Sequence, residues 1–72
     1  MELTDREYEV VTNVYGDEMP RDVRKIETEQ LWKMHDQVTD AVQLSHEDDD
    51  IDSLGILLPL ERKIVHILAE RV

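Results

Sequence analysis

The residues of this sequence most able to do chemistry are carboxylates, and five of them recur at helical spacing. The steps between them are 7, 7, 4 and 7 residues: Asp22, Glu29, Asp36, Asp40 and Glu47. Steps of seven and four residues return to nearly the same helix face, with rises of roughly 10 Å and 6 Å. Such a row is similar in sign and rough spacing to one phosphate strand of a DNA duplex. The alternative is an ordinary solvated helix face, and Glu47 joins the row only if the helix passes Ser45.

The single tryptophan of the chain adds to this pattern. Trp32 stands opposite the apolar residues of the expected helix and beside the acidic row. Aromatic residues make up only 4% of the sequence, so an exposed tryptophan is typical of a binding anchor. The alternative is that Trp32 covers a neighbouring helix or a second copy of the chain.

A second cluster of acids has the spacing of a calcium loop only at its start. Asp48, Asp50 and Asp52 alternate as in the opening of such a loop. The sixth position would be Ser53 instead of glycine, and the twelfth would be Pro59 instead of glutamate. We therefore expect no dedicated metal site and no cofactor here.

Other catalytic and metal-binding patterns are missing from the sequence. His35, His46 and His66 do not stand four residues apart, and cysteine is absent. With only Gly16 and Gly55, the chain has no glycine-rich phosphate cradle, and it has no nucleophile elbow. The sequence predicts a binding protein and no enzyme.

The length and net charge of the chain indicate which classes of partner it can bind. The 72 residues carry a net charge of −10, and residues 1–20 and 45–60 each carry −5. This charge repels nucleic acid and anionic membranes and favours basic partners; the alternative is that it only keeps the protein soluble. There is no apolar run long enough to span a membrane and no signal-peptide pattern. We expect one cytoplasmic domain over residues 1–72.

Helix-start and helix-stop residues predict the first element clearly. Thr4 and Glu7 form a capping box, while Leu3 and Tyr8 have the spacing of a hydrophobic staple. Gly16 is a natural stop. We therefore predict a helix over residues 5–15.

The rest of the chain predicts two more helices. Apolar residues at a period of 3.6 predict a long central helix over about 21–45, which leaves room for a break near Thr28. Residues 46–55 are acidic and predict a loop, and Pro59 suits the first turn of a last helix over about 59–71. Lys63 is expected to face outward, and the state of 56–58, strand or coil, stays open.

The predicted fold class is all-α: a three-helix mini-domain with a long central helix. Apolar burial in so small a domain barely outweighs chain entropy. A central helix that overhangs two short ones would leave apolar surface uncovered. A homodimer that uses residues 54–58 would cover it.

Two resemblances bear on function. Residues 3–11, LTDREYEVV, resemble the opening of LuxR-type helix-turn-helix domains, but the likeness ends where Asp17 to Pro20 replace that family's polar turn and basic helix. DNA binding is not implied. As a short, cysteine-free, acidic chain, the protein is also similar to phage-encoded DNA mimics, the class of the uracil-DNA glycosylase inhibitor and anti-restriction proteins. Other members block histone-like nucleoid proteins such as HU.

The class resemblance implies a non-enzymatic inhibitor that occupies the DNA-binding surface of a basic host protein. The residues expected to contact that partner are nine: Asp5, Glu9, Glu29, Trp32, Asp36, Asp40, Asp48, Asp49 and Asp50. The alternative is a small regulatory module, antitoxin-like or adaptor-like, whose apolar groove binds a partner helix.

Overall fold

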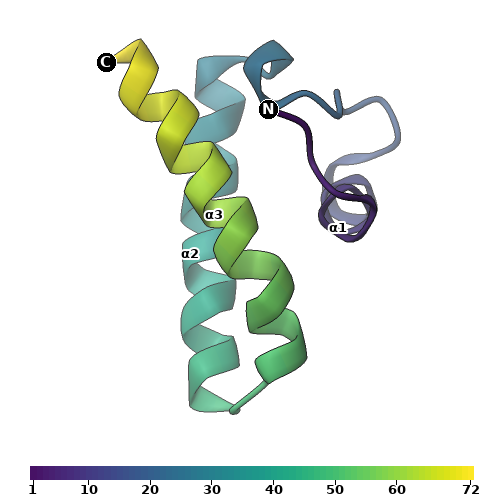
Figure 1. Cartoon of the computed structure of the whole chain (residues 1–72), viewed down its shortest axis with the longest axis vertical. Coiled ribbons are helices and arrows are strands. Elements are labelled where there is room, and N and C mark those ends of the chain that lie inside the picture. Colours follow the sequence, from purple (N-terminus) through teal and green to yellow (C-terminus); the bar gives the residue numbers. More distant parts are fainter.

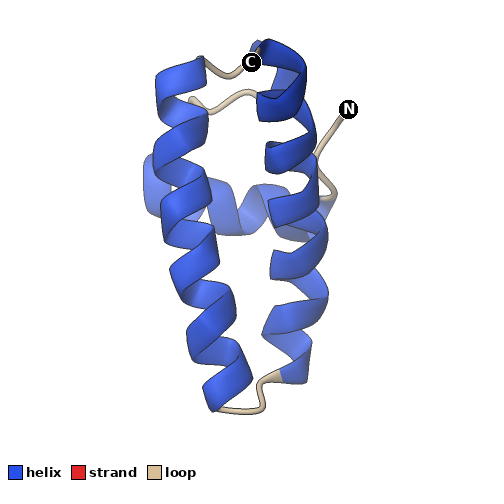
Figure 2. Ribbon diagram, turned by 90° about the vertical axis from the view of Figure 1, so that its left-hand side faces the viewer, coloured by secondary structure: helices blue, strands red, loops and turns tan.

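The fold is a helical hairpin with a third helix laid across it. The computed structural model describes residues 1–72 and contains α1 (Asp5–Tyr15), the short 3-10 helix η1 (Val23–Lys25), α2 (Thr28–Glu47) and α3 (Ile51–Arg71), with no strands. The helices α2 and α3 run antiparallel and side by side (Figure 1). A quarter turn shows α1 crossing behind this hairpin (Figure 2). The all-α prediction is confirmed.

The first helix begins and ends where the sequence predicts. The N–H of Glu7 donates to Oγ1 of Thr4 (3.3 Å), and the N–H of Thr4 donates to Oε1 of Glu7 (2.8 Å). These two bonds satisfy donors that a helix start leaves unpaired. Gly16 ends the helix at φ 99°, a backbone conformation that favours glycine.

The prediction of the central helix is wrong for its first residues, because the chain before α2 is hydrogen-bonded to the N-terminal residues. The N–H of Leu3 donates to the carbonyl of Arg21 (2.9 Å), and the N–H of Val23 donates to the carbonyl of Met1 (3.0 Å). This pairing needs extended backbone at Asp22, which then caps η1 through Arg24 N–H. The helix therefore starts at Thr28, the point at which the sequence left room for a break.

The last turn of α3 holds the segment before α2 in its extended form. Arg71 donates to the carbonyls of Ile26 (2.7 Å) and Arg24 (2.8 Å). Arg24 in turn pairs with Glu70 through two hydrogen bonds, of 2.7 and 3.2 Å. In a longer α2, these carbonyls would accept hydrogen bonds within the helix. Here they accept from Arg71 of α3 instead, and Ile26 stays buried.

The prediction of an acidic loop over 46–55 is also wrong, since only Asp48 to Asp50 separate α2 from α3. Asp49 has φ 54°, and the N–H of Asp50 donates to the carbonyl of Ser45 (2.8 Å). This is a Schellman-type helix end, with Asp49 at the left-handed position. Asp50 then caps α3 by accepting from the N–H (3.2 Å) and Oγ (2.7 Å) of Ser53, which lowers the pKa of Asp50.

Pro59 lies inside α3, contrary to the expectation that it would start a helix. Its ring leaves the carbonyl of Gly55 without a helical donor, and both residues are exposed to water. Burial of a large aliphatic side chain contributes roughly 1.5–3 kcal/mol, so several such residues outweigh the roughly 3 kcal/mol that proline costs. The buried residues of α3 run through this point: Leu57, Leu60, Ile64, Ile67 and Leu68.

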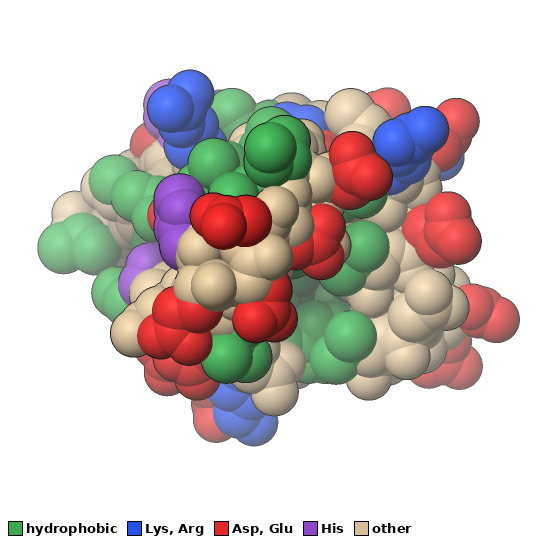
Figure 3. Space-filling model, turned by 90° about the horizontal axis from the view of Figure 1, so that it is seen from below, with side chains coloured by type: hydrophobic (Ala, Val, Ile, Leu, Met, Phe, Trp, Pro, Cys, Tyr) green, Lys and Arg blue, Asp and Glu red, His purple; other side chains and the backbone are tan.

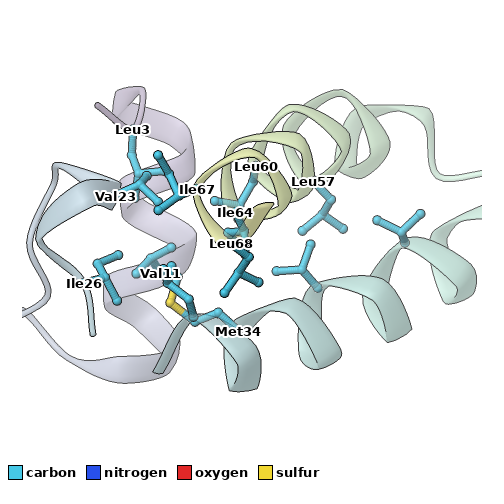
Figure 4. Packing of buried hydrophobic residues seen from close by; sticks show 13 residues of the cluster. Leu3, Val11, Val23, Ile26, Met34, Leu57, Leu60, Ile64, Ile67 and Leu68 are labelled. Atoms are coloured by element: carbon cyan, nitrogen blue, oxygen red, sulfur yellow. The ribbon is translucent and has the colours of Figure 1, made fainter. Parts of the chain in front are cut away.

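The core lies between the hairpin and the N-terminal third of the chain. It is one cluster of 13 buried hydrophobic residues, most of which Figure 4 labels. Leu3, Val11, Val23 and Ile26 reach it from the N-terminal side and meet Ile64, Ile67 and Leu68 of α3 (Figure 4). All four helices, with Leu3 and Ile26 beside them, thus contribute to a single core.

The lengths of the helices remove one argument for a homodimer. With 20 residues in α2 and 21 in α3, the central helix does not overhang a shorter one. Leu57, in the middle of the expected dimer contact, is in the core, while Leu54 and Leu58 are half-buried. The homodimer stays a prediction that no longer rests on an uncovered helix.

Replacing Pro59 by alanine is expected to stabilise the protein. The substitution Pro59→Ala restores the hydrogen bond to Gly55, so the free energy of unfolding should rise by about 1–3 kcal/mol. Urea unfolding followed by circular dichroism measures this as a higher midpoint at unchanged slope. Arg62→Ala, at an exposed position nearby, is the control and should stay within about 0.5 kcal/mol of the parent. A midpoint that fails to rise would contradict this account of α3.

Candidate functional site

The acidic row lies on the outer face of α2, away from the core. Leu31, Met34 and Val38 of this helix are buried. Its carboxylates are exposed: Glu29, Asp36, Asp40 and Glu47. Because α2 passes Ser45, Glu47 joins the row. Twenty residues of α-helix span about 30 Å, so the row follows nearly the whole helix.

The row continues around the tip of the hairpin. Asp48 and Asp49 are exposed in the turn that follows Glu47. Viewed from this end, carboxylates gather over the tip (Figure 3). Asp50 differs, because both of its carboxylate oxygens accept hydrogen bonds from Ser53. We call the six other carboxylates the acidic strip: Glu29, Asp36, Asp40, Glu47, Asp48 and Asp49.

The acidic strip is not neutralised from within the chain. None of its carboxylates pairs with a lysine or arginine, and only Asp36 lies near a basic group, 3.7 Å from Nδ1 of His35. Lys33 shares α2 with the strip and forms no ion pair with it. Unpaired carboxylates on one side of a helix keep their full charge available for a partner.

The structure separates Asp5 and Glu9 from the acidic strip. Both lie on exposed positions of α1, which packs on the core from another side than α2. Asp5 is already paired with Arg21, and Asp22 caps η1 and lies 3.6 Å from the amino group of Met1. The acidic strip is therefore defined without these acids, and contact of Asp5 and Glu9 with a partner stays a prediction.

Trp32 stands at the edge of the strip, on α2 between Glu29 and Asp36. Its side chain is 48% exposed and meets His35 edge-on, with ring centroids 6.0 Å apart. The other side of the indole lines a hollow of about 200 Å³ with residues of α3, among them Val65 and Leu68. Trp32 thus covers part of a neighbouring helix and still presents half of its surface.

A second feature, which sequence reasoning did not locate, is an open apolar groove between all three helices. The helix α1 packs on α3 and η1 packs on α3, but no Cα atom of α1 comes within 8 Å of α2. The space between them has a volume of about 220 Å³, and nine of its ten lining residues are hydrophobic. They are Val10, Val11, Val14, Tyr15, Met34, Gln37, Val38, Ala41, Leu57 and Leu60. Figure 3 shows this apolar hollow between α1 and the hairpin.

Val14 illustrates why the sequence did not reveal the groove. Its helical position places it with the apolar residues of α1, yet its side chain is 61% exposed. Across the groove, the hydroxyl of Tyr15 donates to Oε1 of Gln37 on α2. Burial raises the pKa of that tyrosine. This polar contact connects α1 to α2 without closing the space between them.

Glu7 joins α1 to α3 through a buried ion pair. Its side chain is 3% exposed and pairs with Nζ of Lys63, contrary to the expectation that Lys63 faces outward. Burial alone would raise the pKa of Glu7. The hydrogen bonds from Lys63 and from the N–H of Thr4, together with the charge of Lys63, outweigh burial and lower that pKa.

The side chains do not come together as a metal-binding group, since no three histidine, cysteine, aspartate or glutamate side chains are placed to hold one ion. Nδ1 of His35 is buried without a hydrogen-bond partner, and the acid beside it is Asp36, at 3.7 Å. The geometry thus offers two surfaces for macromolecular contact, the acidic strip and the apolar groove.

Comparisons of the chain with known protein families, with curated proteins and with solved structures found no match. None of the helices combines the length and the apolar character needed to cross a membrane. The acidic strip and the apolar groove are therefore the features of this molecule that indicate a function.

The ion pair of Glu7 predicts how stability responds to pH. Because folding lowers the pKa of Glu7, its contribution is present above the pKa of the unfolded chain, near pH 4.5, and disappears as pH falls through the lower folded value. Glu7→Gln keeps a residue that can form the capping box but leaves Lys63 unpaired. We expect a loss of about 1–3 kcal/mol at pH 7 and a shallower fall in stability between pH 5 and pH 3 than in the parent.

Thermal unfolding measured across this pH range tests the effect. Glu9→Gln removes the same charge two residues away, at an exposed position without an ion pair, and is the matched control. Equal stability of Glu7→Gln and the parent at pH 7 would show that the pair contributes nothing.

Proposed function

We propose that the protein is a non-enzymatic inhibitor whose acidic strip occupies the DNA-binding surface of a basic protein, for example the nucleoid protein HU. One observation carries this proposal: six exposed carboxylates follow one helix face and the adjoining turn, and no lysine or arginine of the chain pairs with them. A basic protein that normally binds phosphates offers the complementary charge.

The spacing of the strip is compatible with contacts made by long basic side chains. Phosphates follow one another every 3.4 Å or so along one DNA strand. Steps of seven and four helical residues rise about 10 Å and 6 Å, so the carboxylates match roughly every third or second phosphate. Flexible lysine and arginine side chains can reach charges at such intervals.

Trp32 completes the proposed surface. It lies within one helical turn of Glu29 and of Asp36, so a partner that covers these carboxylates also covers the exposed half of the indole. Asp5, Glu9 and Asp50 stand outside the proposal, because they lie on another helix or are engaged in a helix cap.

The alternative function, a helical interaction module, uses the apolar groove instead of the strip. The two functions differ in how salt affects binding. Contacts that replace phosphates weaken linearly in log affinity as log salt rises. The apolar contacts in a groove respond little to salt, and any salt dependence of groove binding does not involve the carboxylates of the strip.

The test of the strip is a charge-removing triple variant. Glu29→Gln, Asp36→Asn and Asp40→Asn together preserve shape and remove three charges. In competition with duplex DNA for HU, the parent should displace the DNA. The triple variant should displace it less well, with a salt dependence flatter by about one unit of slope for each lost contact.

The matched control removes three charges elsewhere. Glu9→Gln, Asp17→Asn and Glu18→Gln change exposed acids outside the strip and should leave the competition unchanged. If the strip variant competes as well as the parent, or if the parent binds DNA itself in a gel shift, the proposal is wrong.

Trp32→Ala is expected to act differently from the charge variants. An anchor that is desolvated on binding contributes through burial, so affinity should fall by about tenfold or more at every salt concentration. Circular dichroism checks that the helices persist, since Trp32 also contacts α3. Val65→Ala trims the other exposed wall of the same hollow and is the control. A loss that disappears at high salt would contradict a burial role.

A further inference from the structure

The apolar groove is an unfilled part of the molecule's surface. Val14 of α1 is 61% exposed at its rim. On α2, Leu44 is 60% exposed and lies one turn beyond Ala41, which lines the groove. Apolar side chains therefore extend from the groove along the hairpin towards its tip, where water now meets them.

The dimensions of the groove indicate what kind of occupant it takes. Its volume of about 220 Å³ is below the roughly 300–1,000 Å³ of typical small-molecule sites. An α-helix with its side chains is about 10 Å across and does not fit inside. What fits are the side chains that one face of a helix projects at positions i, i+3 or i+4, and i+7.

The charges around the groove indicate which kind of partner helix it would bind. Glu9 lines a second hollow that adjoins the groove at Val10, and Asp17 and Glu18 are exposed just after Tyr15. We call these three acids the rim acids. Arg6 lines the same hollow as Glu9, which leaves Asp17 and Glu18 as the acids in excess, in a chain whose net charge is −10.

A second copy of the chain is the wrong partner for this rim. Each copy carries a net charge of −10, so a dimer through the groove would bring like charges together around it. A helix with lysine or arginine beside its apolar face meets the rim acids with opposite charge. Complementary charge of this kind steers association and sets orientation.

We propose that the apolar groove is a second binding surface, which takes the apolar face of a basic amphipathic helix from a partner protein. Leucine-like side chains of that helix enter between Val14 and Ala41, and its flanking basic residues face the rim acids. The inference does not depend on the function of the acidic strip, which lies on another face of α2.

A designed peptide provides the direct test. The probe is a helical peptide of about five turns, with leucine at i, i+3 or i+4, and i+7 and lysine on the flanks. Calorimetry should give one peptide per chain. Amide shifts in NMR spectra should centre on Val10, Val14 and Ala41, away from Asp36. A peptide with glutamate in place of lysine should bind at least about tenfold more weakly, as like charges then face each other.

Variants of the protein locate the contact. Val14→Gln places a polar group at the rim, and Ala41→Gln fills the hollow from the opposite wall; each should weaken peptide binding by about tenfold or more. Circular dichroism shows whether each variant folds. If one of the two fails to fold, the other still tests the contact. Val65→Gln makes a similar exchange at an exposed position of α3 outside the groove and should bind as the parent does.

The charge variants separate this inference from the proposed function. Removing the rim acids (Glu9→Gln, Asp17→Asn, Glu18→Gln) should weaken peptide binding, while the strip variant (Glu29→Gln, Asp36→Asn, Asp40→Asn) should not. Three results would overturn the inference: a scrambled peptide that binds equally well, a glutamate peptide that binds equally well, or amide shifts confined to the acidic strip.

Discussion

One buried carboxylate determines how the N-terminal helix is attached. Glu7 caps α1 and pairs with Lys63 of α3, 56 residues along the chain. A buried charge is tolerated only when paired and hydrogen-bonded, so α1 stays where these donors reach it. That position is against α3 and more than 8 Å from every Cα of α2. The open space between α1 and α2 is the geometric result, and it leaves the apolar groove exposed.

What the sequence predicts well is what local chemistry determines. Thr4, Glu7 and Gly16 define α1 because capping bonds connect residues three or four apart. The acidic row on α2 follows from helical periodicity in the same way. The apolar groove and the pairing of Lys63 were not predictable, because both depend on how α1 crosses the hairpin.

The sequence misleads where a tertiary contact overrides a local preference. The acidic residues 46–55 and Pro59 indicate a long loop and a helix start. Burial of Leu57 and Leu60 instead extends α3 back through Pro59 to Ile51, so only Asp48 to Asp50 remain as a turn. Before α2, pairing with the N-terminal residues makes Asp22 extended, which removes this acid from the row. Only part of the predicted site therefore forms a single surface: its α2 residues and the turn that follows them.

The aromatic residues are distributed so that optical signals from different parts of the molecule stay separate. Trp32, the only tryptophan, is 48% exposed, so part of its indole is in contact with water in the folded protein and can be covered by a partner. Both tyrosines belong to α1, where Tyr8 bonds to the carbonyl of Met19 and Tyr15 bonds to Gln37. Tryptophan emission thus reports on whatever covers the outer face of α2, while tyrosine absorbance follows the attachment of α1.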